Sequence, residues 1–300
     1  MLTFIQSLLN ISPILDQQAD RGKPTMNSKK IAIIGGGNMG VAMARGILQT
    51  KWATADRMMI AEPLKERLEH IRGLAHGIRA SHSNLEAANW ADVVLLSVKP
   101  QIMGHVLDEI KPALKDNKLV ISVAAGISTE YIEKKAGGRV PVIRAMPNIA
   151  AVVRESATAI CRGKFATDKD LTTARHIFES VGIVVEIDEE TLMDAVTGLS
   201  GTGPMYVFQI LEGLSDAGVK VGLSRDIANM LAVQTLIGSS KLIKETKEHP
   251  AKLKDLVTSP GGTAISALHS LEKNGLKALL IDAVEVACKR SSELGSTKKD

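Results

Sequence analysis

Ten residues near the start of the chain, IAIIGGGNMG at positions 31–40, restrict the possible folds more than any other segment. The four apolar residues come without polar alternation, as in a strand buried on both faces of a parallel sheet. The glycines satisfy the pattern G-x-G-x-x-G and are followed by a helical segment. Gly35 permits a tight turn, Gly37 lets the backbone approach a pyrophosphate, and Gly40 lets helix and strand pack closely. This context predicts dinucleotide binding at the start of the helix, with an ordinary glycine-rich turn as the alternative.

Beyond this segment, short β-branched runs alternate with helical segments as far as Asp188. Such alternation predicts an α/β fold, a doubly wound Rossmann sheet with right-handed crossovers. Helices are expected at 64–74, 102–114 and 168–180. After the first strand, further strands are expected at 58–60, 93–96, 119–123, 140–143, 156–161 and 182–187.

After Asp188 the strand-like runs stop, and the sequence predicts an all-helical C-terminal domain. Several of its helices are apolar around most of their circumference, so they need partners on more than one side. We infer an interface between subunits, with a self-contained bundle as the alternative. The expected helices are 190–199, 204–220, 225–245, 264–273 and 276–294. The predicted organisation is a flexible tail (1–28), a Rossmann domain (29–188) and a helical dimerisation and substrate domain (189–300).

Composition excludes several classes of protein. Of the 300 residues, 37 are Lys or Arg and 33 are Asp or Glu, and the small surplus is spread along the chain. A nucleic-acid binder needs a concentrated basic face, so nucleic acid is not an expected partner. The apolar stretch at the start is interrupted and too short to span a membrane. Cys161 and Cys288 lie far apart, and no histidines are paired at metal-ligand spacing, so we expect no metal and a reducing, cytoplasmic location.

Glu62 follows the second expected strand, twenty-two residues beyond Gly40. An acid at this distance accepts hydrogen bonds from the adenosine ribose, and its charge repels a 2′-phosphate, which favours NAD over NADP. Lys65 and Arg67 follow closely and can offset a phosphate. A solvated turn residue is the alternative for Glu62. Two further segments follow strand ends and should face the nicotinamide; Lys99 lies in one of them and is otherwise a surface lysine.

In the helical half, VTSPGGT at 257–263 leads into an amphipathic helix. Successive backbone N–H groups and hydroxyls at the positive end of a helix form an anion-binding nest. Ordinary helix capping is the alternative, but a cap needs only one hydroxyl, and two glycines cost stability.

Taken together, these segments resemble the pyrroline-5-carboxylate reductase family over about residues 30 to 295. The resemblance implies NAD(P)H-dependent reduction of 1-pyrroline-5-carboxylate to L-proline, the last step of proline biosynthesis. It also implies a helical dimerisation domain and active sites completed across the dimer interface, and larger rings of dimers occur in similar enzymes. The motifs that carry it are GGGNMG (35–40), SVKPQ (97–101), VAAG (123–126), RAMPN (144–148), GLSGTGP (198–204) and VTSPGGT (257–263).

By position, the resemblance assigns two sets of contacts. The imino-acid substrate contacts are Ser259, Gly261, Gly262 and Thr263, with a weaker case for Glu190. No side chain is identified as a general acid, and solvent can supply the proton. The contacts to NADPH or NADH are Ile34, Gly35, Gly36, Gly37, Asn38, Met39, Gly40, Glu62, Asn84, Ser97, Val98, Lys99, Pro100, Val123, Ala124 and Ala125.

Two departures and two rival functions remain. The family often has a second threonine where this chain has Ala264, and many relatives have a neutral or basic residue at Glu62. A β-hydroxyacid dehydrogenase is one rival, but Val207 stands where that family has its lysine. A non-catalytic nucleotide-sensing protein is the other; Ala264 favours it, and the intact loop at 259–263 opposes it.

Overall fold

The computed structural model describes residues 28–296, so nearly all of the expected tail lies outside the described residues. The described chain forms two compact units. One contains residues 28–204 together with 283–296, and the other contains residues 205–282. The boundaries predicted from sequence, at 188–189, stay a prediction.

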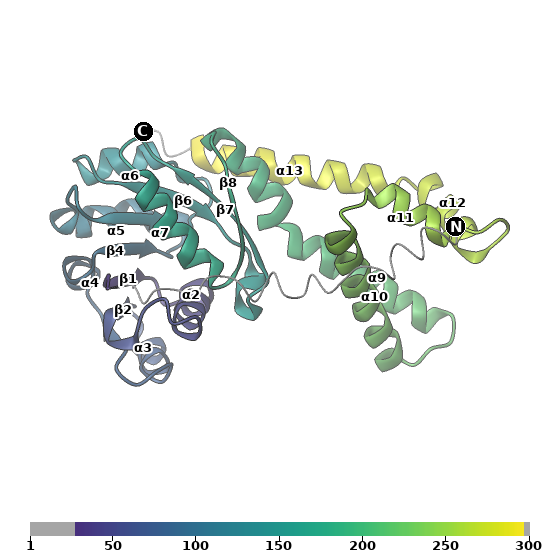
Figure 1. Ribbon diagram of the computed structural model, residues 1–300, viewed down its shortest axis with the longest axis horizontal. Helices are drawn as coiled ribbons and strands as arrows, with labels where there is room; N and C mark the ends of the chain where they lie inside the picture. Colours follow the sequence, from purple (N-terminus) through teal and green to yellow (C-terminus); the bar gives the residue numbers. More distant parts are fainter. Residues whose placement is uncertain (1–27, 297–300) are drawn as a thin grey trace. The chain divides into compact units, whose positions relative to one another are not determined.

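The first unit is built on an eight-stranded sheet (Figure 1). Its order is β3-β2-β1-β4-β5-β6-β7-β8, and the first six strands of this order are parallel. β7 pairs antiparallel with β6, and β8 continues parallel to β7. This confirms the Rossmann sheet. The strands are β1 (Ile31–Ile34), β2 (Met58–Ala61), β3 (Arg79–Ser81), β4 (Val93–Leu96), β5 (Leu119–Ser122), β6 (Val142–Met146), β7 (Ser156–Arg162) and β8 (Gly182–Glu186).

Helices cover both faces of this sheet, as a doubly wound fold requires. Ile31 and Ile33 of β1 belong to one apolar core, and Ala32 and Ile34 belong to the other. All four residues are fully buried, which explains the unbroken apolar run in the sequence. The helices are α2 (Asn38–Gln49), α3 (Lys65–Arg72), α4 (Asn84–Trp90), α5 (Met103–Ile110), α6 (Thr129–Ala136), α7 (Asp168–Glu179) and α8 (Met193–Val196).

Three of these elements were not expected from the sequence: β3, α4 and α6. Both helices are short and begin with a serine cap, since Ser83 accepts the N–H of Glu86 and Ser128 accepts the N–H of Tyr131. The expected helix at 102–114 is shorter in the structure, because α5 ends at Ile110 and a 3₁₀ turn containing Pro112 follows.

The expected helix at 190–199 is divided into a 3₁₀ turn, α8 and a π-helical turn at Thr197–Gly201. Gly198 is the first residue of the GLSGTGP motif, and the packing of this turn explains why the residue is glycine. A Cβ there would lie 2.8 Å from the carbonyl oxygen of Val284 and 3.0 Å from the backbone nitrogen of Cys288. The turn therefore packs directly on helix backbone, which only glycine allows.

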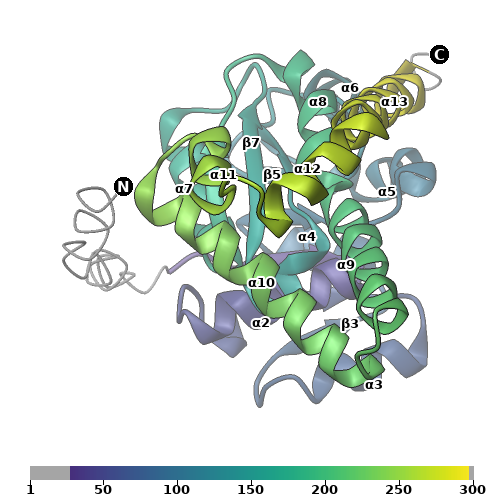
Figure 2. The same cartoon turned by 90° about the vertical axis from the view of Figure 1, so that its right-hand side faces the viewer.

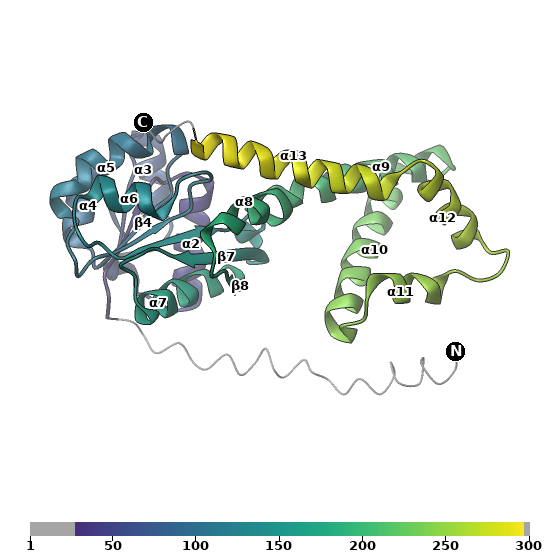
Figure 3. The same ribbon diagram turned by 90° about the horizontal axis from the view of Figure 1, so that it is seen from above.

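The second unit is helical, as expected, and its helices can be followed in Figure 2 and Figure 3. Many apolar side chains are exposed in this chain, for example Met230 at 71% and Leu231 at 54%. Across the described residues, no helix is both long and apolar enough to cross a membrane. The helices are α9 (Gly203–Lys220), α10 (Arg225–Thr246), α11 (Pro250–Val257), α12 (Thr263–Lys273) and α13 (Leu276–Ser296); α9 and α13 extend into the first unit, and α11 was not expected.

Candidate cofactor and substrate sites

The residues assigned to the cofactor come together along the carboxyl edge of the parallel sheet. Ile34 is the last residue of β1, the others follow β1, β2, β3, β4 and β5, and the strand order reverses between β1 and β4. In open α/β sheets, ligands bind outside the carboxyl ends of the strands at this point. The topology therefore gathers segments from five separate parts of the sequence at one end of the parallel strands.

The three glycines of the fingerprint have the geometry that their spacing predicts. Gly35 has φ +103°, and a Cβ there would lie 2.5 Å from the carbonyl oxygen of Ser97. A Cβ on Gly40 would lie 2.1 Å from the carbonyl oxygen of Gly35. Gly37 instead faces open space, since no other described residue beyond its chain neighbours comes within 4 Å of its Cβ position. The loop therefore leaves room for a ligand at the residue that should approach the pyrophosphate.

Helix α2 presents its amino terminus at this loop. Its N-cap is Gly37, and no side chain caps the first backbone N–H groups. These groups and the helix dipole favour an anion.

Glu62 is buried at 3% exposure rather than being a solvated turn residue, so that alternative is wrong. Its Oε2 accepts the backbone N–H of Gly36 at 2.9 Å, and its Oε1 accepts the N–H of Leu64 at 3.1 Å. The guanidinium of Arg67 lies 3.9 Å from the same carboxylate and is half exposed. Glu62 thus joins the glycine-rich turn to the end of β2.

Two more residues complete this edge. The Oγ of Ser97 is buried and has no hydrogen-bond partner among the described residues. Asn84, the first residue of α4, donates its amide to Glu109 of α5 at 2.8 Å. An orphaned hydroxyl, open space at Gly37 and an uncapped helix end all fit a dinucleotide, so the residues present fit NADPH or NADH.

The loop assigned to the substrate lies in the helical unit, between α11 and α12. Gly262 is the N-cap of α12, and no side chain caps this helix. Gly261 has φ +65°, and a Cβ on Gly262 would lie 2.4 Å from the Oγ of Ser259. Ser259 and Thr263 are exposed. Neither hydroxyl is used as a cap, so this geometry supports the anion-binding interpretation over ordinary capping.

Glu190, the weaker substrate candidate, lies in the first unit within a polar cluster. Its carboxylate accepts the backbone N–H of Thr129 at 2.8 Å and the Thr129 hydroxyl at 2.6 Å. The guanidinium of Arg144, almost completely buried, lies 3.3 Å from Glu190 and 3.4 Å from Asp194. Asp194 also accepts the hydroxyl of Ser291 at 2.7 Å. Glu190 therefore joins β6, α6 and the turn before α8.

Sequence reasoning did not single out the partners of Glu190. Arg144 entered the sequence analysis only as part of RAMPN. A charged residue directly after the apolar run at 140–143 is the feature that could have singled it out. In the same motif, Asn148 donates its amide to the carbonyl of Ser200 at 3.0 Å. This bond joins the RAMPN and GLSGTGP segments.

Two groups near this cluster titrate abnormally. Burial raises the pKa of the Cys161 thiol to about 11, and the charge of Glu190 adds to the rise. Burial also raises the pKa of Glu133, although backbone hydrogen bonds from Phe165 and Lys164 oppose that shift. One oxygen of Glu133 is buried without a hydrogen-bond partner among the described residues.

The Rossmann sheet and a match to an NADP-dependent oxidoreductase profile define a class: the chain is a Rossmann-type oxidoreductase that uses a nicotinamide dinucleotide. Two family profiles match it. One, described as NADP oxidoreductase coenzyme F420-dependent, matches residues 30–126, and one for pyrroline-5-carboxylate reductase dimerisation matches residues 190–294.

Curated relatives and solved structures agree with these profiles. Pyrroline-5-carboxylate reductase of Methanosarcina acetivorans is 42% identical over 90% of this chain and 99% of the relative. Human pyrroline-5-carboxylate reductase 2 is 40% identical over 89% of this chain and 84% of the relative. The structure of the Plasmodium falciparum enzyme with NADP bound has a TM-score of 0.82 at 36% identity, covering 90% of this chain and 99% of that one. The chain belongs to the pyrroline-5-carboxylate reductase family.

Proposed function

We propose that the chain reduces 1-pyrroline-5-carboxylate to L-proline with NADPH or NADH, the last step of proline biosynthesis. The reaction balances: one imine, one reduced dinucleotide and one proton give one secondary amine and one oxidised dinucleotide, and the hydride passes from the dinucleotide to the imine carbon. Family membership supports the reaction, and the uncapped, hydroxyl-bearing amino terminus of α12 is the observation in this chain that carries it. A substrate with a carboxylate beside a C=N bond needs such an anion cradle.

The Rossmann unit holds the cofactor in this proposal. The free N–H groups at the start of α2 bind the pyrophosphate beside Gly37, and the Ser97 hydroxyl donates to the ligand that borders it. Glu62 fixes the turn and faces the adenosine ribose. Bound NADPH or NADH supplies the hydride.

The helical unit holds the substrate. The N–H groups of α12 and the hydroxyls of Ser259 and Thr263 bind the carboxylate, which fixes the orientation of the ring. Hydride transfer then requires the imine carbon within roughly 3–3.5 Å of the donor carbon. Because a protonated imine accepts hydride readily, no strong base is needed, and solvent supplies the proton. Ala264 offers no hydroxyl to the imine nitrogen, so Thr263 or water occupies that role.

The chain forms a homo-oligomer through its dimerisation domain. We further propose that the oligomer contains dimers whose interface completes the active site, and that these dimers form rings. The exposed apolar side chains of α10 support the dimer, because a helix with this much free apolar surface needs a partner. Sedimentation of the full chain measures the assembly. The cytoplasmic location expected from the two free cysteines also belongs to this proposal, and cell fractionation tests it.

Ligand-linked stability tests the proposal without turnover. Because a ligand bound only to the native state raises Tm, proline should raise the Tm of the protein–NADP⁺ complex beyond the shift caused by NADP⁺ alone. The Ser259→Ala variant should keep the NADP⁺ shift and lose most of the proline shift. A protein that responds to NADP⁺ and ignores proline would instead favour the nucleotide-sensing alternative.

A further inference from the structure

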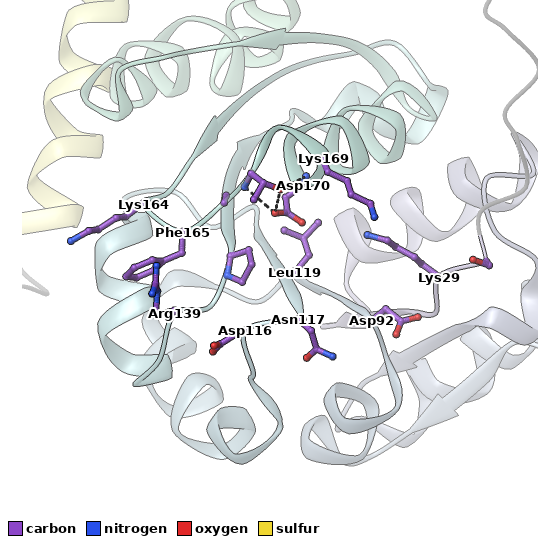
Figure 4. A pocket seen from close by; sticks show the side chains of 14 residues that line it. Lys29, Asp92, Asp116, Asn117, Leu119, Arg139, Lys164, Phe165, Lys169 and Asp170 are labelled. Carbon is purple, nitrogen blue, oxygen red and sulfur yellow. Dashed lines mark hydrogen bonds between the residues drawn. The ribbon is translucent and has the colours of Figure 1, made fainter.

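A hollow lies at the amino-terminal ends of the parallel strands, away from the carboxyl ends to which the cofactor contacts are assigned (Figure 4). Its volume is about 870 Å³, within the size range of small-molecule sites. It is formed where the chain enters β1, β4, β5 and β6 and where β7 leads into α7. We call it the basal hollow. The cofactor and substrate assignments use none of its residues.

Three cationic side chains on the basal hollow form no ion pair with another described residue. Arg139, Lys164 and Lys169 line it, and none of them takes part in an ion pair within residues 28–296. Arg139 and Lys164 both lie 5.7 Å from the centre of the Phe165 ring, which restrains the two cations at one side of the hollow. In Figure 4, Lys169 and Lys29 point toward one another from opposite sides.

The acidic residues of the lining are not paired with these three cations. Asp170 is held in the capping box of α7, where it accepts the N–H and the hydroxyl of Thr167 at 2.9 and 2.6 Å. Asp92 accepts the backbone N–H of Lys30 at 2.8 Å. Asp116 also lines the hollow, but within residues 28–296 it forms no ion pair with Arg139. The lining therefore has four cationic side chains and three carboxylates, a small net positive charge that favours an anion over a cation.

The loop that carries Lys164 and Phe165 is held by a buried carboxylate of α6. The backbone N–H groups of both residues hydrogen-bond to the carboxylate of Glu133, a buried side chain of α6. A Cβ on the neighbouring Gly163 would lie 2.4 Å from that carboxylate, so the loop lies close against it. Glu133 therefore holds in place the loop that carries the Lys164 ammonium group and the Phe165 ring.

We propose that the basal hollow binds a small phosphate-bearing anion. A guanidinium fork and ammonium groups around one space suit phosphate oxygens, and the hollow has room for more than a single phosphate group. This proposal does not depend on the reductase activity. Because the three cations are exposed, binding should weaken as salt rises.

The test is calorimetric titration of the full chain with inorganic pyrophosphate. NADP⁺ is kept saturating, so that the phosphate cradle at α2 is filled. The wild type should bind pyrophosphate saturably, with an affinity that falls with added NaCl. The triple variant Arg139→Gln, Lys164→Gln, Lys169→Gln should bind at least about tenfold more weakly. Inorganic phosphate and citrate serve as further probes, and citrate binding as tightly as pyrophosphate would contradict a preference for phosphate.

A matched control removes the same charges elsewhere. Arg45, Lys111 and Lys134 are exposed and lie outside the hollow, so their triple Gln variant should bind pyrophosphate like the wild type. Circular dichroism of both variants checks the fold, which exposed side chains should not alter. The proposal is overturned if the wild type shows no saturable binding, if the first variant keeps it, or if the control loses it equally.

Discussion

The Glu62 carboxylate accepts the backbone N–H of Gly36 at 2.9 Å, so an acid at the end of β2 is bound to the turn after β1. The side chain is almost completely buried, and its second oxygen accepts the N–H of Leu64. One residue thus joins the glycine-rich loop to the end of β2 and places a carboxylate where we propose that the ribose binds.

Replacing Glu62 by Gln should shift cofactor preference toward NADPH. The variant removes the charge that repels a 2′-phosphate and leaves Arg67 free to attract one. We expect the ratio of kcat/KM for NADPH to that for NADH to rise by about tenfold, which corresponds to roughly 1.4 kcal/mol.

Glu66→Gln is the matched control, because Glu66 lies exposed on α3 near the same edge. It should leave the cofactor ratio unchanged. An unchanged ratio in the Glu62 variant, with both variants folded, would show that backbone groups set the preference.

The position of Glu62 was predictable from the sequence, but its burial was not. The distance from the fingerprint indicates an acid at the end of β2, and that is where it lies. Its bond to Gly36 depends on how closely two separate turns approach each other, and no local pattern encodes this. The sequence likewise gave no indication that the buried Ser97 hydroxyl would have no hydrogen-bond partner among the described residues.

Ser259→Ala should raise the KM for 1-pyrroline-5-carboxylate. Loss of a hydrogen bond to a charged group costs about 1.5–3 kcal/mol, which predicts a KM about 10- to 150-fold higher. Ser270→Ala, on the exposed part of the same helix, should leave KM unaltered. Steady-state kinetics at saturating cofactor measure both. Equal KM values in the wild type and the Ser259 variant would remove this residue from the substrate site.

The Glu133→Gln variant should become more stable relative to the wild type as pH rises. Burial raises the pKa of this carboxyl in the folded state above its usual value of 4.5, with the Glu190 charge adding to the rise. The protonated form thus contributes stability below about pH 4.5, which is lost as pH rises through the folded pKa. The free energy of unfolding of the variant, relative to the wild type, should therefore increase between about pH 4 and pH 7.

Urea unfolding at several pH values measures this difference, with Glu130→Gln as the exposed control on α6. The control should show no such trend. A difference for Glu133→Gln that is constant or falls with pH would contradict the raised pKa.

The thiol of Cys161 should resist alkylation in the native protein. It is 1% exposed, and its pKa of about 11 lowers the thiolate fraction near pH 8 by about a hundredfold compared with an ordinary cysteine. In a Cys288→Ser background, iodoacetamide should label Cys161 in urea and leave it unlabelled without urea, as read by mass spectrometry. Native labelling at the unfolded rate would place Cys161 on an accessible surface.

The long elements of the fold were predictable because their periodicity extends over many residues. The unbroken apolar runs of β1 and β4 have the bounds expected from the sequence. The missed elements, β3, α4, α6 and α11, are short, and packing against neighbours fixes them more than propensity does. α4 and α6 show that a serine cap followed by only two turns is too weak a signal without the tertiary contacts.

Imine reduction by this chain is measured by the absorbance of the reduced nicotinamide. The full chain is mixed with 1-pyrroline-5-carboxylate, with NADH and NADPH in parallel reactions. Substrate-dependent oxidation of the nicotinamide, with L-proline formed in equal amount and NADH oxidised faster because of Glu62, is the predicted result. Folded protein that binds the dinucleotide but oxidises neither form would contradict the reductase assignment and favour the nucleotide-sensing alternative.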